Sequence, residues 1–196
     1  DCKQSISLRY PLTELVTAIL SAVVAIYFGY TWALAAGLIL TWSLICLCMI
    51  DFDTQYLPDV ITIPLLWAGL LFSLLPDTTA NTIMISPSQS IIGAALGYMI
   101  LWLVFHTFKL ITGKEGMGYG DFKLYAALGA WMGWHLLPLI IILSSFVGAI
   151  VGIGLIIFKG RDKNTPIPFG PYLAAAGWIA LIWGKDIINF YSKNLL

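Results

Sequence analysis

Two aspartates in this chain lie where carboxyl groups could carry out acid–base chemistry. Asp51 ends the long apolar run TWSLICLCMI, and Asp121 begins the apolar stretch FKLYAALGAWMG. Two carboxyls that share one site cannot both ionise readily, so one keeps its proton near neutrality. One carboxylate can then take a proton from water while the other donates to a carbonyl oxygen, which is the chemistry of an aspartic protease. The alternative is that both acids only mark helix ends that face water.

The residues around the two aspartates bear on this choice. Asp53 competes with Asp51 for a chemical role, but two residues further along a helix it faces elsewhere. Glycine stands at alternate positions in GMGYGD, the segment that ends at Asp121. Glycine permits close backbone approach or a positive φ, so a substrate strand could lie against Gly118 and Gly120. The same glycines could also form only a flexible turn.

The composition restricts the class of protein that positions these acids. Of the 196 residues, 60% are hydrophobic and 10% are charged, against about 25% charged in soluble domains. The mean hydropathy is +0.91 and the formal net charge is zero. These values exclude a soluble enzyme, a disordered tail and a nucleic-acid-binding module, and they predict the lipid bilayer as a partner.

Seven apolar runs predict an all-α, polytopic membrane helix bundle with about seven transmembrane helices. Alternating ten-residue segments, which would indicate a β-barrel, are absent from the sequence. The fifth run is short and glycine-rich, and we expect it to enter the bilayer only partly. The predicted spans are 11–30, 32–50, 59–75, 90–111, 120–134, 136–158 and 170–187.

The basic residues orient the predicted bundle. Eight of the ten fall in three regions that lie on one side if the chain crosses seven times; only Lys185 and Lys193 fall on the other side. The positive-inside rule makes the eight-residue side cytoplasmic. Asp51 and Asp121 then lie together at the cytoplasmic edge of the membrane. The eight residues are Lys3, Arg9, Lys109, Lys114, Lys123, Lys159, Arg161 and Lys163.

Four patches of the sequence, taken together, resemble the type IV prepilin peptidases, a family of membrane aspartic proteases of the GxGD type. DFDTQYLPD, which begins at Asp51, resembles the family's D-x6-P-D motif, and GYGDFK resembles its GxGDxK motif. SISLRYPLTEL and IPFGPYLAAAG are also similar to that family, and the four patches follow its order over nearly the whole chain. The resemblance makes Asp51 and Asp121 the catalytic pair.

The resemblance implies an enzyme of the bacterial inner membrane, multi-pass, with its active site facing the cytoplasm. Such enzymes cleave the short basic leader of type IV prepilins or pseudopilins, in pilus assembly or type II secretion. They then methylate the new amino terminus with S-adenosylmethionine, whereas the peptidase step needs no cofactor.

The chain departs from the family pattern at its beginning. Family members carry a first membrane span and a cytoplasmic domain with two CxxC pairs that bind zinc, and Cys2 resembles the last of those cysteines. We therefore expect residues 1–10 to be a remnant of that region and residues 11–196 to form the membrane-embedded peptidase domain. Cys46 and Cys48 are predicted to be small core residues. No metal site is predicted within the chain, and methyltransferase activity of this part alone stays open.

Three further residues are candidates for supporting roles. Asp59 either caps the third span at its amino end or acts directly in catalysis. Lys123 either biases the aspartate pair or holds substrate, or it only extends to the membrane surface. Glu14 either favours the dipole of the first span from about its first turn or faces the substrate groove.

Other polar residues have plainer interpretations. We expect Glu115 to be a solvated loop acid, His106 to be a satisfied polar group, and His135 to lie on the opposite side. The segment from Pro166 to Pro171 is a turn into the last span or a wall of the active-site mouth.

Two other functions compete with a peptidase. A small transporter could use carboxylates as proton or ion sites, but it would be expected to carry acids near the bilayer midplane and often related halves. A non-catalytic scaffold would leave both aspartate motifs unexplained.

Overall fold

The computed structural model describes residues 7–75, 85–113, 116–159 and 168–195. These residues are mostly helical, with no β-strand among them. The predicted all-helical bundle is confirmed, and each predicted span corresponds to one helix. In chain order the elements are α1 (Arg9–Phe28), α2 (Trp32–Thr54), α3 (Asp59–Phe72), α4 (Pro87–Thr112), α5 (Tyr119–Met132), the 3₁₀ turn η1 (Trp134–Leu136), α6 (Leu137–Lys159) and α7 (Gly170–Leu195).

Local sequence signals define several helix ends. Ser86 and Gln89 form a reciprocal capping box at the start of α4, and Pro87 occupies the first turn, where its missing N–H costs nothing. Gly113 ends α4 with φ 69°, a left-handed conformation that glycine adopts without steric cost. Helix α2 ends at Gln55, which has φ 53°.

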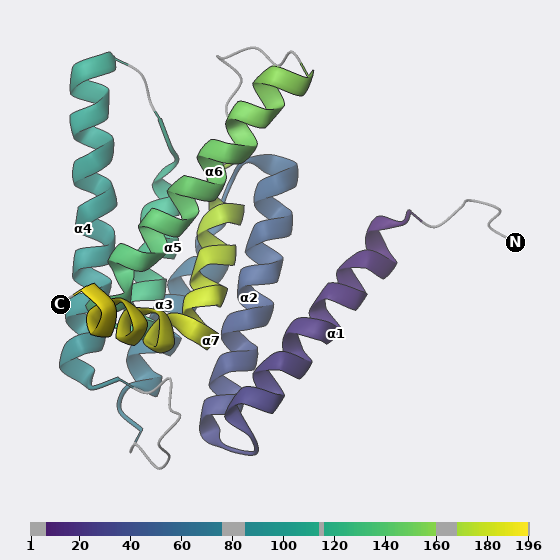
Figure 1. Cartoon of the computed structure of the whole chain (residues 1–196), viewed down its shortest axis with the longest axis vertical. Helices are drawn as coiled ribbons and strands as arrows, with labels where there is room; N and C mark the ends of the chain where they lie inside the picture. The colour runs from purple at the N-terminus through teal and green to yellow at the C-terminus, as the bar shows by residue number, and fades with distance from the viewer. Residues whose placement is uncertain (1–6, 76–84, 114–115, 160–167, 196) are drawn as a thin grey trace, which may run out of the picture.

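The helices run alternately up and down, so that the helix ends gather at two ends of the bundle (Figure 1). The turn between α2 and α3, the start of α5 and the start of α7 lie at the upper end. The turn at 29–31 and η1 lie at the lower end, and the last part of α7 turns across that end. The alternation therefore places the end of α2 beside the start of α5, as the sequence predicts.

Helix α5 forms the centre of the bundle. Eleven of its 14 residues are buried, and it packs against α3, α4, α6 and α7. Glycines let α4 approach closely: a Cβ built on Gly97 would lie 2.7 Å from the Tyr125 carbonyl oxygen. Ser90 of α4 also donates a 2.6 Å hydrogen bond to the Ala130 carbonyl oxygen. Small residues at such contacts are typical of helix packing in membranes.

Within the described residues, five helices are long and apolar enough to cross a membrane: α1, α2, α4, α6 and α7. Helices α3 and α5 have 14 residues each, which is about 21 Å of helix against a hydrocarbon core of about 30 Å. The prediction that the fifth span is short is therefore confirmed, and the third span is equally short. Surrounding helices cover α5, so it does not need to match the lipid thickness.

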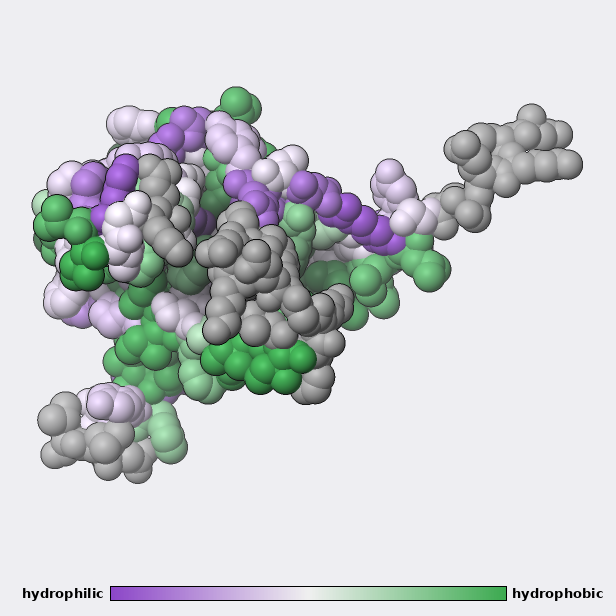
Figure 2. Space-filling model, turned by 90° about the horizontal axis from the view of Figure 1, so that it is seen from above, coloured by the Kyte–Doolittle hydropathy of each residue, from purple (hydrophilic) through white to green (hydrophobic). Residues whose placement is uncertain are grey.

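The outer surface is apolar, as a membrane protein requires. Large hydrophobic side chains project outward from the long helices, such as Ile26, which is 86% exposed, and Ile142, which is 67% exposed. Figure 2 looks onto the upper end and shows hydrophilic residues gathered there, with hydrophobic residues along the sides. Helix α1 packs on α2 and leans away from the other helices toward its amino end (Figure 1).

Candidate active site

Asp51 occupies the last turn of α2 at the upper end of the bundle. Its side chain is buried, with 4% of the residue exposed. The backbone N–H of Gly170, at the start of α7, donates to this carboxyl. The Oδ2 atom of Asp51 is buried and has no hydrogen-bond partner among the described residues. A buried polar atom of this kind is rare in proteins and is often associated with catalysis.

Asp121 lies in the first turn of α5 and is 6% exposed. Its Oδ2 accepts a 3.1 Å hydrogen bond from the backbone N–H of Gly118, which begins the helix. A carboxylate in this position also interacts favourably with the positive end of the helix dipole. Asp51 and Asp121 are close enough for the charge of one to act on the other. The structure thus brings together the two aspartates that the sequence singles out.

Leu57 joins the elements that carry the two carboxyls. It lies in the turn between α2 and α3 and is 3% exposed. A Cβ built on Gly120 would lie 2.7 Å from the Leu57 Cβ, and one built on Gly170 would lie 3.2 Å from the Leu57 Cδ1. Neither glycine has a positive φ. Gly120 is therefore required for helix packing on Leu57, rather than for an unusual backbone conformation.

Gly170 is the site residue that the sequence argument misses. A Cβ built on it would lie 2.6 Å from Oδ2 and 3.1 Å from Cγ of Asp51. Only a residue without a side chain leaves the Asp51 carboxyl where it is. The signal in the sequence is the IPFGPYLAAAG patch, of which residues 168–177 are described; its first glycine, Gly170, begins α7 directly beside Asp51.

Asp53 points away from the pair, as predicted. Both of its oxygens accept 2.7 Å hydrogen bonds from the guanidinium of Arg9. This ion pair is about half exposed and links the end of α2 to the start of α1. Asp53 therefore has a structural partner outside the site.

Asp59 and Lys123 form a second ion pair beside the site. The Lys123 Nζ donates to both Asp59 oxygens at 2.6 and 2.7 Å. The prediction that Asp59 caps α3 is wrong, because Pro58 holds the cap position and Asp59 is the first helical residue. The pair connects the last residue of D-x6-P-D to the last residue of GxGDxK, and so fastens α3 to the helix that carries Asp121.

The other polar candidates lie away from the two aspartates. Glu14 is exposed and stands beyond the first turn of α1, so its predicted first-turn role is wrong. His106 is hydrogen-bonded through Nδ1 to the Trp102 carbonyl oxygen at 2.9 Å. His135 belongs to η1 at the lower end. Glu115 lies outside the described residues.

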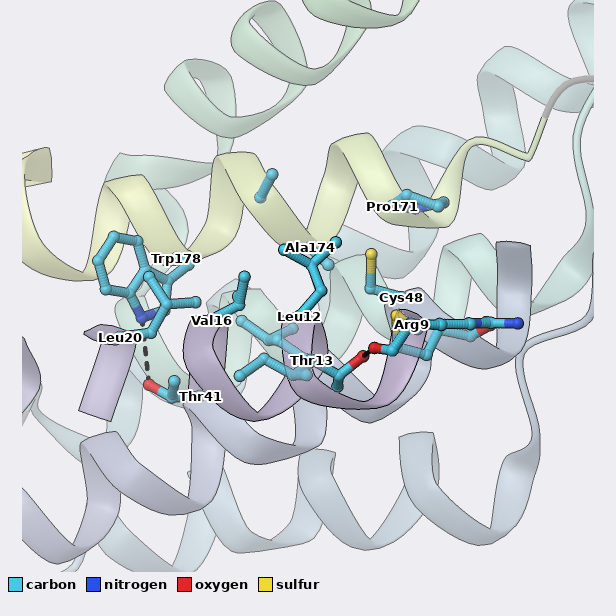
Figure 3. Close-up of a pocket in the computed structure, with 14 residues that line it drawn as sticks. Arg9, Leu12, Thr13, Val16, Leu20, Thr41, Cys48, Pro171, Ala174 and Trp178 are labelled. Carbon is cyan, nitrogen blue, oxygen red and sulfur yellow. Dashed lines mark hydrogen bonds between the residues drawn. The ribbon is translucent and has the colours of Figure 1, made fainter. Parts of the chain in front are cut away.

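An apolar groove runs down from the site between α1, α2 and α7 (Figure 3). Its cavity volume is about 240 Å³. Cys48 lines the groove, while Cys46 of the same helix is exposed, so the prediction that both are core residues fails for Cys46. No group of three His, Cys, Asp or Glu side chains suited to a metal occurs in the described part of the chain.

The fold and the site define a helical membrane protein with two buried aspartates at one end of its bundle. The profile of the type IV leader peptidase family matches residues 38–153, which contain both aspartates. The chain therefore belongs to that family.

Several relatives are similar over nearly the full chain. The prepilin leader peptidase/N-methyltransferase of Aeromonas hydrophila is 54% identical over 195 residues, which cover 100% of this chain and 65% of the relative. The proteins of the same name from Pseudomonas aeruginosa and Legionella pneumophila are 54% and 44% identical, each over 97% of this chain and 64% of the relative. The chain thus spans about 65% of the length of the relatives it matches. No solved structure matches the chain.

Proposed function

We propose that this chain is the peptidase part of a membrane aspartic endopeptidase that removes the leader of prepilins or pseudopilins. The observation that carries the proposal is the pair of buried carboxyls, Asp51 and Asp121, at one end of the membrane bundle. Membership of the type IV leader peptidase family supports the substrate class, because the relatives carry prepilin leader peptidase in their names.

The two carboxyls suit hydrolysis of a peptide bond by water. One carboxylate takes a proton from the water as its oxygen attacks the carbonyl carbon, and the other carboxyl donates to the carbonyl oxygen. When the tetrahedral intermediate collapses, the C–N bond breaks, and the carboxyl that took the proton from water gives it to the leaving amine. The other carboxylate takes a proton back from a hydroxyl of the intermediate, so that both groups return to their starting states. Both side chains are almost fully buried, and the exclusion of bulk water strengthens their action on the substrate.

The position of the pair sets how the substrate approaches. Asp51 ends an apolar helix long enough to cross the membrane, so the scissile bond is cut at the membrane surface. The substrate's basic leader lies in the water phase, and its apolar segment lies in the bilayer beside the bundle. The lysine and arginine distribution of the sequence supports the cytoplasmic face of the bacterial inner membrane for this end.

The two other groups that the family resemblance implies have no part in this step. Zinc does not fit the described residues, because they contain no cluster of metal-binding side chains. The groove does not suit the charged groups of S-adenosylmethionine, because its lining is apolar and its arginine, Arg9, is bonded to Asp53. We therefore derive no methylation chemistry from this chain.

The experiment that tests the function is incubation of the purified chain with a prepilin, with leader removal read by mass spectrometry. A peptidase cuts the prepilin at a single bond and yields two fragments, the leader and the remainder. A transporter or a scaffold leaves the prepilin intact. The same assay on the Aeromonas hydrophila relative controls for the part of that protein that this chain does not match.

Labelling of single cysteines in intact cells tests the orientation. Tyr30 and Tyr56 are both exposed and lie in turns at opposite ends of the bundle. In a background without native cysteines, an impermeant reagent should label Tyr30→Cys and not Tyr56→Cys. The reverse pattern would place the aspartate pair outside.

A further inference from the structure

We propose that the groove between α1, α2 and α7 is the binding site for the apolar segment of the substrate, and that it sets substrate affinity rather than the chemical step. This inference rests on the proposed peptidase function and adds to it the place where the substrate's membrane segment lies. Arg9, Cys48 and Pro171 mark the upper end of the groove, which is at the right in Figure 3. Thr41 and Trp178 mark the lower end, which is at the left.

The groove begins beside the aspartate pair. Cys48 is one helical turn before Asp51 on α2, and the charge of Asp51 reaches its thiol. Pro171 follows Gly170, whose backbone amide donates to Asp51. When the scissile peptide bond of the substrate is held at Asp51, the upper end of the groove is therefore about one helical turn away. The residues that follow that bond can reach it.

The groove can hold its occupant only by apolar contact. Its polar side chains are already satisfied within the protein: Trp178 Nε1 donates to Thr41 Oγ1 at 3.2 Å, and Thr41 donates to the Gly37 carbonyl oxygen at 2.7 Å. Thr13 donates to the Arg9 carbonyl oxygen at 2.8 Å. The charged residue of the lining, Arg9, is paired with Asp53. The groove thus selects hydrophobic side chains, which matches a segment that stays in the bilayer and not the basic leader.

The dimensions of the groove fit one face of a helix. From Pro171 to Trp178 α7 advances seven residues, which is about 10 Å, or about a third of the hydrocarbon core. The volume of about 240 Å³ exceeds the roughly 150 Å³ that accepts benzene in an engineered cavity. It accepts large side chains of a helix but not the helix itself. Ala174 and Ala175 have small side chains, so the α7 side of the groove permits close approach of a second helix.

Helix α1 forms the outer wall and makes the groove accessible from lipid. It packs on α2 and leans away from the other helices at its upper end (Figure 1). A substrate helix that diffuses in the bilayer can therefore reach the groove sideways, without leaving the membrane.

Replacement of Ala175 with tryptophan tests this site. Ala175 is exposed and lines the groove, so a large side chain there fills the binding site and not the protein core. We expect Ala175→Trp to raise the KM for a prepilin about tenfold or more, because the apolar contacts of one or two large side chains are lost, and to leave kcat within about twofold. Ala95→Trp, at an exposed position of α4 outside the groove, is the matched control and should not change KM.

A second substrate separates loss of binding from general damage. Replacing the first two turns of the prepilin's apolar segment with serine should raise KM for the unsubstituted protein. Ala175→Trp should then add little, because the two changes remove the same contact. Fully additive effects would contradict the proposal.

A photo-crosslinking residue at position 175 identifies the occupant directly. We expect it to capture the prepilin in the membrane-reconstituted protein, and the same residue at position 95 not to do so. Capture of lipid or of the protein's own preceding segment alone, with an unchanged KM for Ala175→Trp, would overturn the inference. Cleavage by the unsubstituted protein in the same assay would show that the peptidase proposal still stands.

If Ala175→Trp does not fold, a large group can instead be attached to Ala175→Cys after the protein has folded. The native cysteines are first changed to serine, and the purified protein is alkylated with a bulky maleimide. The KM should rise on alkylation, and it should not rise for Ala95→Cys treated in the same way. Equal KM values before and after alkylation at position 175 would exclude the groove as the substrate site.

Discussion

Gly170→Ala should damage catalysis through a single added methyl group. The new Cβ would lie 2.6 Å from Oδ2 of Asp51, whereas ordinary contacts begin at 3.4 Å. Either the carboxyl or the start of α7 must therefore move by about 0.8 Å, and a misplacement of about 1 Å can cost roughly 10²-fold in rate. The backbone N–H that donates to Asp51 is retained in this variant. A loss of rate therefore results from the added methyl group and not from a lost hydrogen-bond donor.

The assay is steady-state cleavage of a prepilin, with kcat and KM determined separately. We expect kcat to fall by roughly 10²-fold and KM to change little, because the groove is unaltered. Gly154→Ala on α6 is the matched control, since its Cβ would meet nothing within 4 Å. If Gly170→Ala cleaves within about twofold of the unsubstituted rate, the close packing of α7 on Asp51 has no catalytic importance, and this reasoning is refuted.

Two further predictions concern the packing around the pair. Gly120→Ala should lower the free energy of unfolding by about 1–3 kcal/mol through overpacking against Leu57. Gly118→Ala should keep both thermal stability and cleavage, because its Cβ would come no closer than 3.8 Å to another group. Equal behaviour of the two variants would contradict the packing of Gly120 on Leu57. Asp59→Lys and Lys123→Asp should each destabilise the protein by about 1–2 kcal/mol. This value lies between those of exposed and buried ion pairs, because the Asp59 side chain is 45% exposed and the Lys123 side chain is 30% exposed. The double exchange should restore most of the loss in thermal melts, and failure to restore it would mean that the ion pair does not fasten α3 to α5.

The course of the chain through the membrane could be predicted from the sequence because each helix carries its own signal. Apolar runs of known length predict the spans, and alternation of the spans places Asp51 and Asp121 at one end. Asp53 could be set aside because a two-residue offset on a helix changes the direction of a side chain. These inferences need only local periodicity and topology.

The contacts that complete the site could not be predicted in the same way. Gly170 meets Asp51, and Lys123 meets Asp59, across separations of 119 and 64 residues. A single sequence contains no information on which distant residues pair. Asp59 resembled a helix cap, but the cap position falls one residue earlier, on Pro58, and both Asp59 oxygens accept hydrogen bonds from Lys123.

The length of α3 could not be predicted either. The apolar run of the third span extends past Phe72, where α3 ends, and composition does not show whether an apolar helix faces lipid or protein. Glu14 was placed too near the start of its helix because α1 begins two residues earlier than predicted, at Arg9.

The central claim is that Asp51 and Asp121 together hydrolyse the leader peptide bond. The most direct measurement compares prepilin cleavage by purified Asp51→Asn, Asp121→Asn and Asp53→Asn, with thermal stability recorded for each in detergent. We predict that the first two variants fold and do not cleave, because asparagine keeps the shape of aspartate but cannot exchange the proton. Asp53→Asn should retain most of the activity, since it loses only a half-exposed ion pair to Arg9. Cleavage at the unsubstituted rate by either Asp51→Asn or Asp121→Asn would contradict the account.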